Sequence, residues 1–298
     1  MKKHKLPVAV KTQNAESTEL ENISALIRDK IAVEKIICFG SVIKSISRKS
    51  CFTPEETNIS EEELNSYCIL IVPAADEKLA DIMIQQRTEE ALKHLACVTV
   101  IVHRMQEFNS ALQNGSTFFT AVYKNGMLLY DKQEEPFIVP SGKVEVSKRI
   151  IRREKFWHQW FDLSNDFLIG ARFYASKEKN NLAVFMLHQT LQHCYSGVLR
   201  VYIGYRTNTN GLRRLIKLIE TAVPDYKLSS AKSSPEDARL SGLLLKGFGD
   251  ARYNDKFEAT NEEVATLVDR IADILQFANS SCLARIKDIK EGKTSYIA

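Results

Sequence analysis

The chain has 298 residues, enough for one or two domains that each bury a proper core. Its hydrophobic fraction of 44% and charged fraction of 26% are typical of a soluble globular protein. The net charge of +4 is unevenly distributed, because residues 136–215 carry 13 Lys and Arg against 5 Asp and Glu. This basic segment predicts an attraction for phosphate-bearing partners.

The N-terminus and the cysteines indicate the compartment. The first residues, 1–7, lack the apolar segment of a signal peptide. No apolar run reaches the ~20 residues that a membrane span needs. The six cysteines are scattered without a CxxC pair, which is typical of buried free thiols rather than of a zinc site or a disulfide framework. We therefore expect a cytoplasmic protein with no membrane contact, no metal and no cofactor.

Residues 1–135 predict a small α/β domain, because apolar strands alternate with amphipathic helices. The predicted strands lie at 35–39, 67–72, 97–102 and 127–130. The predicted helices lie at 17–32 and near 77–95, with helical turns over 105–124. Prolines and a Ser-Gly pair mark residues 136–144 as a linker.

The first strand ends at Gly40-Ser41, and the next begins at Tyr67. This arrangement resembles the nucleotidyltransferase domain of the DNA polymerase β superfamily. In that family the Gly-Ser pair opens a helix whose amides hold a nucleotide phosphate, so the resemblance implies that Gly40 and Ser41 bind a ligand. The family's metal-binding carboxylates are missing, because Tyr67, Cys68 and Ile69 stand in their place. A hard cation such as Mg²⁺ needs oxygen ligands, so we expect a scaffold that has lost its metal site.

Residues 145–290 predict helices throughout, which together make a compact bundle. The first helix, 145–178, is rich in aromatic residues and basic at its start. Two later helices have clear starting signals. Ser234 precedes Pro235 and two acidic residues, and Thr260 with Glu263 forms a capping-box pattern.

The helix expected over 181–203 organises this half of the chain. Its core stripe consists of Val184, Leu187, Leu191, Cys194, Val198 and Tyr202. Its polar flank consists of His188, Gln189, Gln192, His193, Ser196 and Arg200, which fall within an arc of roughly 140°. The helix ends at Gly204, and a turn over 206–211 leads to the next helix. An ordinary solvated face and a binding surface both fit this flank.

Four stretches of this half, 185–193, 201–206, 212–215 and 250–253, resemble the HEPN domain (higher eukaryotes and prokaryotes nucleotide-binding). A nucleotidyltransferase-like domain in front of such a bundle is a known pairing. The expected fold is therefore an α+β two-domain chain, a small α/β nucleotidyltransferase-like domain followed by an all-α HEPN helical bundle. The expected boundaries are 1–135, a linker at 136–144 and a bundle at 145–290.

Many members of that family are metal-independent ribonucleases that use an Arg and a His four to six residues apart. Here no histidine follows Arg252, and Asn210 stands where many relatives have a histidine. Arginines precede His158 and His94 at a suitable spacing, but neither pair lies in the expected helix. We therefore expect no catalytic residue.

What remains is a predicted ligand surface in the bundle. Its members are His188, Gln192, His193, Arg206, Asn210, Arg213, Arg214, Arg252 and Tyr253. Arginine binds phosphate with two parallel hydrogen bonds, and tyrosine stacks on a base, so the ligand would be a nucleotide or RNA. Alternatively, Arg252 and Asp250 are members of internal ion pairs that hold helix ends, and the two histidines are bonded within the bundle.

The last helix carries a wide apolar stripe, which predicts a homodimer through the bundle. The stripe consists of Val264, Leu267, Val268, Ile271, Ile274, Leu275 and Phe277. As a function, the sequence favours a nucleotide- or nucleic-acid-binding regulatory protein. A HEPN ribonuclease or toxin-type enzyme and a non-catalytic interaction scaffold remain the alternatives.

Overall fold

The computed structural model describes residues 14–43, 47–50, 65–140, 146–207, 209, 211–223, 226 and 234–293. The chain divides into two compact units. Unit 1 consists of 1–145, 220–225 and 295–298, and unit 2 consists of 146–219 and 226–294. Within the described ranges, none of the helices combines the length and the apolar character that crossing a bilayer requires.

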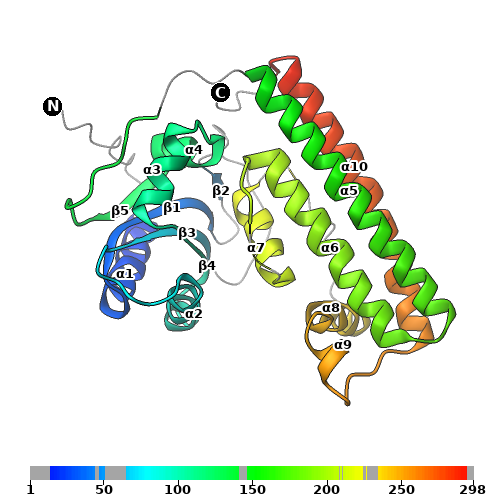
Figure 1. The fold of residues 1–298 in the computed structure, drawn as a ribbon. Coiled ribbons are helices and arrows are strands. Elements are labelled where there is room, and N and C mark those ends of the chain that lie inside the picture. Colours follow the sequence, from blue (N-terminus) through cyan, green and yellow to red (C-terminus); the bar gives the residue numbers. More distant parts are fainter. Residues whose placement is uncertain are drawn as a thin grey trace. The chain divides into compact units, whose positions relative to one another are not determined.

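Unit 1 is built on a five-stranded mixed sheet with the order β2-β1-β3-β4, in which β5 also pairs with β1 (Figure 1). The strands are β1 (Val33–Ile43), β2 (Ser47–Ser50), β3 (Ser66–Pro73), β4 (Cys97–Val102) and β5 (Met127–Asp131). β1 is antiparallel to β2, β3 and β5, whereas β3 and β4 are parallel. β3 is buried along its whole length, as expected for a strand that has both faces covered.

In the described part of unit 1, the sheet is accompanied by four helices: α1 (Asn14–Lys30), α2 (Asp81–Leu92), α3 (Met105–Gln113) and α4 (Thr117–Asn125). One face of the sheet forms a single apolar core with α1 and α2, in which Ile23, Ile69 and Ile84 are fully buried. On the other face, the ring of Phe39 meets Phe118 of α4 edge-on, with 5.5 Å between ring centroids. Because side chains alternate along a strand, β1 supplies Cys38 to the first core and Phe39 to the other face.

Unit 2 is helical. Its elements are α5 (Val146–Ser176), α6 (Asn180–Ile203), α7 (Leu212–Ala222, whose last residues belong to unit 1), α8 (Pro235–Lys246), α9 (Asp250–Tyr253) and α10 (Asn261–Lys290). α5, α6 and α10 pack side by side, and α8 and α9 lie against α6 (Figure 1). The buried Trp157 joins all three long helices, because its ring lies against Gly197 of α6 and its Nε1 donates to Asn279 of α10 at 3.0 Å.

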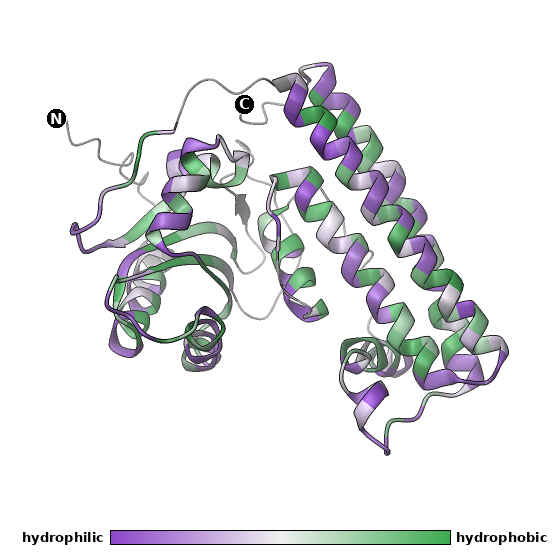
Figure 2. Ribbon diagram, in the orientation of Figure 1, coloured by the Kyte–Doolittle hydropathy of each residue, from purple (hydrophilic) through white to green (hydrophobic). Residues whose placement is uncertain are grey.

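The predicted helix starts in unit 2 are confirmed. Ser234 and Thr260 each form a capping box, in which the hydroxyl oxygen accepts from the amide three residues later. Gly204 ends α6 in the left-handed conformation, with φ of 73°, which glycine adopts without strain. Hydrophobic and hydrophilic residues alternate along α5 and α10 in Figure 2, as they do in helices with one buried and one solvated face.

The apolar stripe of α10 is largely used within unit 2 itself. Val264, Leu267, Val268, Ile271 and Leu275 are all buried there. Ile274 is half-buried, and Phe277 is 45% exposed while its ring lies 5.5 Å from that of Tyr226. The width of the stripe is therefore explained by contacts with α5 and α6 and does not by itself indicate a second copy of the chain.

Candidate ligand site on the helical unit

The polar flank of α6 is buried rather than solvated, because α5, α8 and α10 surround this helix. His188, Gln192 and Ser196 are 1%, 8% and 5% exposed. His188 donates from Nδ1 to the carbonyl of Leu244 at 2.8 Å, at the end of α8. Ser196 donates to the carbonyl of Gln192. The interpretation of His188 as a residue bonded within the bundle is confirmed.

His193 lies between two aromatic side chains of α5. Its ring centroid is 5.1 Å from that of Trp160 and 5.0 Å from that of Phe167. Burial lowers the pKa of His193 below its ordinary value, although the hydrogen bond from Nδ1 to the Gln189 carbonyl opposes this shift. His193 is therefore also bonded within the bundle, and as a neutral ring that donates from Nδ1 it keeps its lone pair on Nε2.

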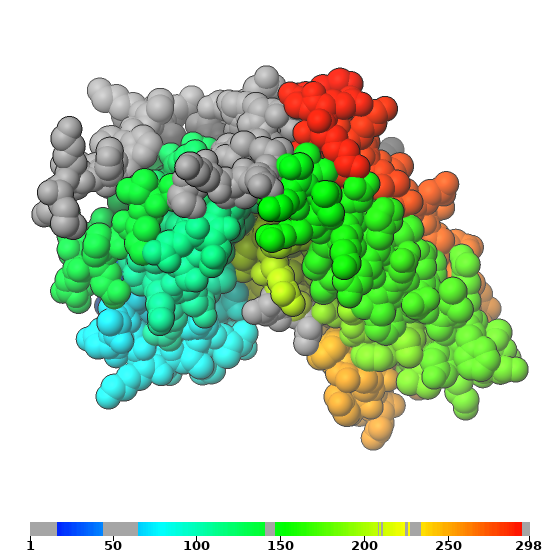
Figure 3. Space-filling model, turned by 45° about the horizontal axis from the view of Figure 1, so that its top comes forward, coloured from blue at the N-terminus to red at the C-terminus, as the bar shows by residue number. Residues whose placement is uncertain are grey.

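Arg252 and Tyr253 have a different environment, at the exposed end of unit 2 formed by α8 and α9. The Arg252 guanidinium carbon lies 4.3 Å from the ring centroid of Phe248 and 4.8 Å from those of Phe185 and Tyr253. We call these four residues the Arg252 cluster. Arg252 is exposed, and Tyr253 is 78% exposed. In Figure 3 the α8–α9 segment (orange) accordingly protrudes at the surface.

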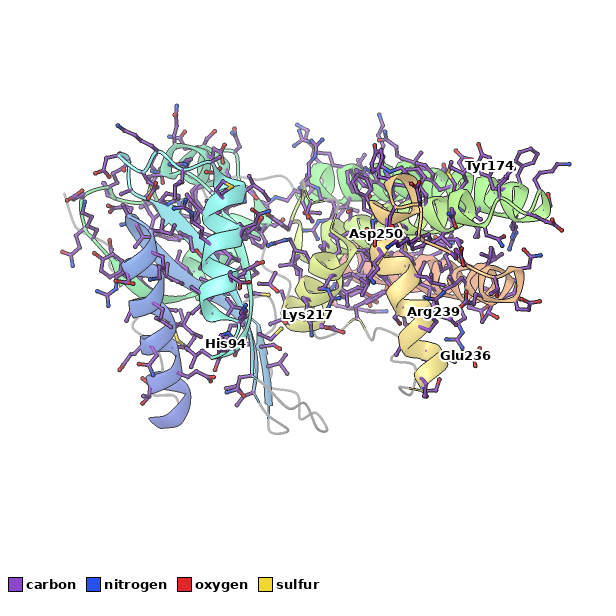
Figure 4. The ribbon with its side chains drawn as sticks, turned by 90° about the horizontal axis from the view of Figure 1, so that it is seen from below. His94, Tyr174, Lys217, Glu236, Arg239 and Asp250 are labelled. Carbon is purple, nitrogen blue, oxygen red and sulfur yellow. The ribbon has the colours of Figure 1, made fainter. Side chains whose placement is uncertain are left out.

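Within the part of the chain that the structure describes, Arg252 forms no ion pair. Its Nε donates to the carbonyl of Phe248 at 2.7 Å, whereas both terminal nitrogens donate to no described residue. Asp250 is the first residue of α9, and α9 follows α8, which contains Glu236 and Arg239 (Figure 4). The alternative prediction, that Arg252 is a member of an internal ion pair, is therefore wrong, because its guanidinium is held by a carbonyl and aromatic rings instead.

The other predicted arginines lie elsewhere in unit 2. Arg206 and Arg213 are exposed and Arg214 is half-buried, while Asn210 lies outside the described residues. Arg206 follows the C-terminal end of α6, whereas Phe185 of the Arg252 cluster lies near its start. At 1.5 Å per residue, roughly 27 Å of helix separates Phe185 from the last residue of α6. The predicted surface is thus divided between the two ends of this helix and is not one pocket.

Gly40 and Ser41 lie inside strand β1 and do not open a helix, so that expectation is corrected. Gly40 pairs with Ser50 and Cys68 on the neighbouring strands, and Ser41 is 5% exposed. A Cβ at Gly40 would lie 3.0 Å from the carbonyl oxygen of Thr221, which also belongs to unit 1. Because β1 continues to Ile43 in pairing with β2 and β3, no helix N-terminus forms at this position for a phosphate.

The strand positions expected to carry carboxylates in a nucleotidyltransferase are part of the core. Ile69 is fully buried, and Tyr67 donates its hydroxyl to Glu19 Oε2 at 2.6 Å. Among the described residues, no group of three or more His, Cys, Asp or Glu is placed to hold a metal ion.

The Arg–His spacings noted in the sequence lie in two different units of the chain. Arg153 is buried and donates to the Val201 carbonyl at 3.3 Å, whereas His158 is exposed, so they lie on different faces of α5. His94 follows the C-terminal end of α2 in unit 1 (Figure 4).

Sequence reasoning missed the two phenylalanines that hold Arg252. Phe185 belongs to α6 and Phe248 to the turn after α8, so they are far apart in the chain. Phe185 appeared only within the 185–193 stretch that resembles the HEPN domain, and Phe248 only as an apolar position of a helix. No local signal indicates that their rings meet at one arginine.

Comparisons with known proteins concern unit 2. Residues 157–281 match the family model of the HEPN domain, and this range includes the Arg252 cluster. No curated protein sequence matches the chain. Among solved structures, the chain is similar to one described as an archaeal HEPN homologue, with 16% identity and a TM-score of 0.31. That similarity covers 42% of this chain and 97% of the other.

Proposed function

We propose that this chain, whose residues 157–281 form a HEPN domain, binds a nucleotide or nucleic acid through the Arg252 cluster. The observation that carries the proposal is an exposed arginine whose terminal nitrogens have no described hydrogen-bond partner, next to a tyrosine ring that is 78% exposed. A guanidinium fork matches phosphate oxygens in geometry and charge. A tyrosine ring offers a stacking face to a base.

Charge supports this proposal. Residues 136–215 carry 13 Lys and Arg against 5 Asp and Glu, so this part of the chain, which includes α5 and α6 but not Arg252 itself, attracts anions. Arg206 and Arg213, at the other end of α6, would contribute to the field without touching a ligand held at Arg252. For a nucleic acid ligand, the affinity should fall steeply as the salt concentration rises, because binding releases counterions from the nucleic acid.

The test is titration calorimetry of the full chain with ATP, GTP and a twelve-nucleotide single-stranded RNA at two salt concentrations. Arg252→Ala should weaken binding by roughly tenfold to a hundredfold, since one charged hydrogen bond contributes about 1.5–3 kcal/mol. Arg172→Ala is the matched control, because Arg172 is also exposed on this unit, on α5. Equal affinities of the Arg252→Ala variant and the wild type would contradict the proposed site.

Two further assignments belong to the same proposal. We take unit 1 to be a nucleotidyltransferase-like domain without transferase activity, supported by the absence of carboxylates on β3 and β4. Incorporation of labelled nucleotide by the full chain would contradict that assignment. We also retain a homodimer, for which exposed Phe277 is the remaining support on α10, and sedimentation of only monomer at tens of micromolar would exclude it.

A further inference from the structure

The Arg252 side chain is held by contacts from two segments that are distant in sequence. Phe248 supplies both its ring and its carbonyl oxygen, which accepts the Nε hydrogen bond at 2.7 Å. Phe185 of α6 supplies a second ring, 4.8 Å from the guanidinium carbon. Phe185 is itself half-buried on α6, and its ring centroid lies 6.3 Å from that of Phe248.

An exposed arginine ordinarily samples many rotamers, and ordering it on binding costs up to about 2 kcal/mol. Stacking against aromatic rings and the bond to the Phe248 carbonyl restrict Arg252 before any ligand arrives. The same contacts leave the edge of the guanidinium that carries the terminal nitrogens without a partner among the described residues. A side chain that is ordered in advance loses less entropy when it binds, which raises affinity.

His188 stabilises the position of Phe248 on α6. Its hydrogen bond to the Leu244 carbonyl ties the end of α8 to α6, and its ring lies 5.7 Å from that of Phe248. Gly247 also lies close to α6, because a Cβ there would be only 3.1 Å from the Val184 carbonyl oxygen and 3.2 Å from the Cβ of His188. The turn that carries Phe248 is therefore seated closely on α6.

We propose that Phe185 is a positioning residue: it holds the Arg252 guanidinium ready for the phosphate of a nucleotide ligand without touching that ligand. This inference rests on the proposed function. Phe185 acts only through Arg252, so its effect on binding must disappear when Arg252 is absent. A merely structural role would weaken binding by the same factor in both backgrounds.

The test is a double-mutant cycle with Phe185→Leu, Arg252→Ala and the double variant. The probe is a twelve-nucleotide single-stranded RNA with a 5′ fluorophore, followed by fluorescence anisotropy on the full chain. Phe185→Leu keeps an apolar side chain of similar bulk but removes the ring. It should weaken binding by about three- to tenfold alone and have no further effect in the Arg252→Ala background. Phe185→Tyr, which keeps the ring, should restore wild-type affinity.

Thermal unfolding of each variant checks that the fold is intact, and Phe185→Met serves as the ring-less variant if Phe185→Leu does not fold. If Phe185→Leu weakens RNA binding equally in both backgrounds, or does not weaken it, Phe185 is not a positioning residue. The effect of Arg252→Ala alone still tests the proposed site in that case. If Arg252→Ala binds as the wild type does, the proposed site and the positioning role fail together.

Discussion

A buried ion pair in unit 1 gives the sharpest test of the structure. Lys35 Nζ lies 2.5 Å from Asp131 Oδ1 and 3.2 Å from Glu34 Oε1, and the side chains of Lys35 and Glu34 are 2% and 1% exposed. Glu34 Oε1 also accepts the backbone N–H groups of Glu134 and Glu135. This network ties the chain after β5 to the start of β1.

The substitution Lys35→Met removes the ammonium group but keeps a side chain of similar length. It leaves the Glu34 carboxylate buried without its cation, and breaking such a pair costs about 3–5 kcal/mol. Asp131 is 30% exposed and can be rehydrated, so we expect a loss near 3 kcal/mol in the free energy of unfolding of unit 1. That is a large part of the ~5–15 kcal/mol that stabilises a typical domain. Adding Glu34→Gln removes the buried charge and should recover part of the loss.

The measurement must report on unit 1, and both tryptophans of the chain lie in unit 2, at positions 157 and 160. Hydrogen exchange of the β1 and β3 amides is suitable, because a loss of 3 kcal/mol lowers protection by roughly a hundredfold. Lys30→Met is the matched control, since Lys30 also pairs with the preceding acid, Asp29, but at the exposed surface. A decrease of less than about tenfold for Lys35→Met, or equal effects of the two substitutions, would refute the reasoning.

Two predictions concern unit 2 and are followed by tryptophan fluorescence during urea unfolding. Gly197→Ala places a Cβ 2.9 Å from the ring of buried Trp157, so overpacking should destabilise unit 2 by about 1–3 kcal/mol. An unchanged urea midpoint would contradict this packing. Burial lowers the pKa of His193 below its ordinary 6.5, so the unfolded chain takes up the proton first as the pH falls. The stabilisation by neutral His193 is thus complete above about pH 6.5 and is lost as the pH falls through its folded pKa. His193→Gln should reduce the loss of stability between pH 7.5 and 5.5, and an NMR titration with a pKa above 6.5 would contradict the prediction.

Local patterns determined most of the elements. Strand β4 has the predicted bounds, Cys97–Val102, because an apolar run of strand-forming residues ends where polar residues begin. The starts of α8 and α10 follow from capping boxes, which involve only four consecutive residues. The core stripe of α6 was predictable for the same reason, since helical periodicity is a property of the segment itself.

Which face of each element is buried depends on the segments that pack against it. A local sequence pattern does not identify these segments. The polar flank of α6 is buried because α8 ends against it, so that His188 finds the Leu244 carbonyl instead of water. Gly40-Ser41 continues a strand because β2 and β3 are present to pair with it.

Arg252 was a reasonable candidate from sequence alone, as a basic residue beside a tyrosine in a HEPN-like stretch. That its guanidinium would be fixed by Phe185 and Phe248 depended on the packing of α8 and α9 on α6. Hydrogen bonds and ring contacts between residues distant in sequence form only when folding brings their helices together. The sequence therefore determined which side chains carry a guanidinium, whereas the tertiary structure decided that the guanidinium of Arg252 lies against the rings of Phe185 and Phe248.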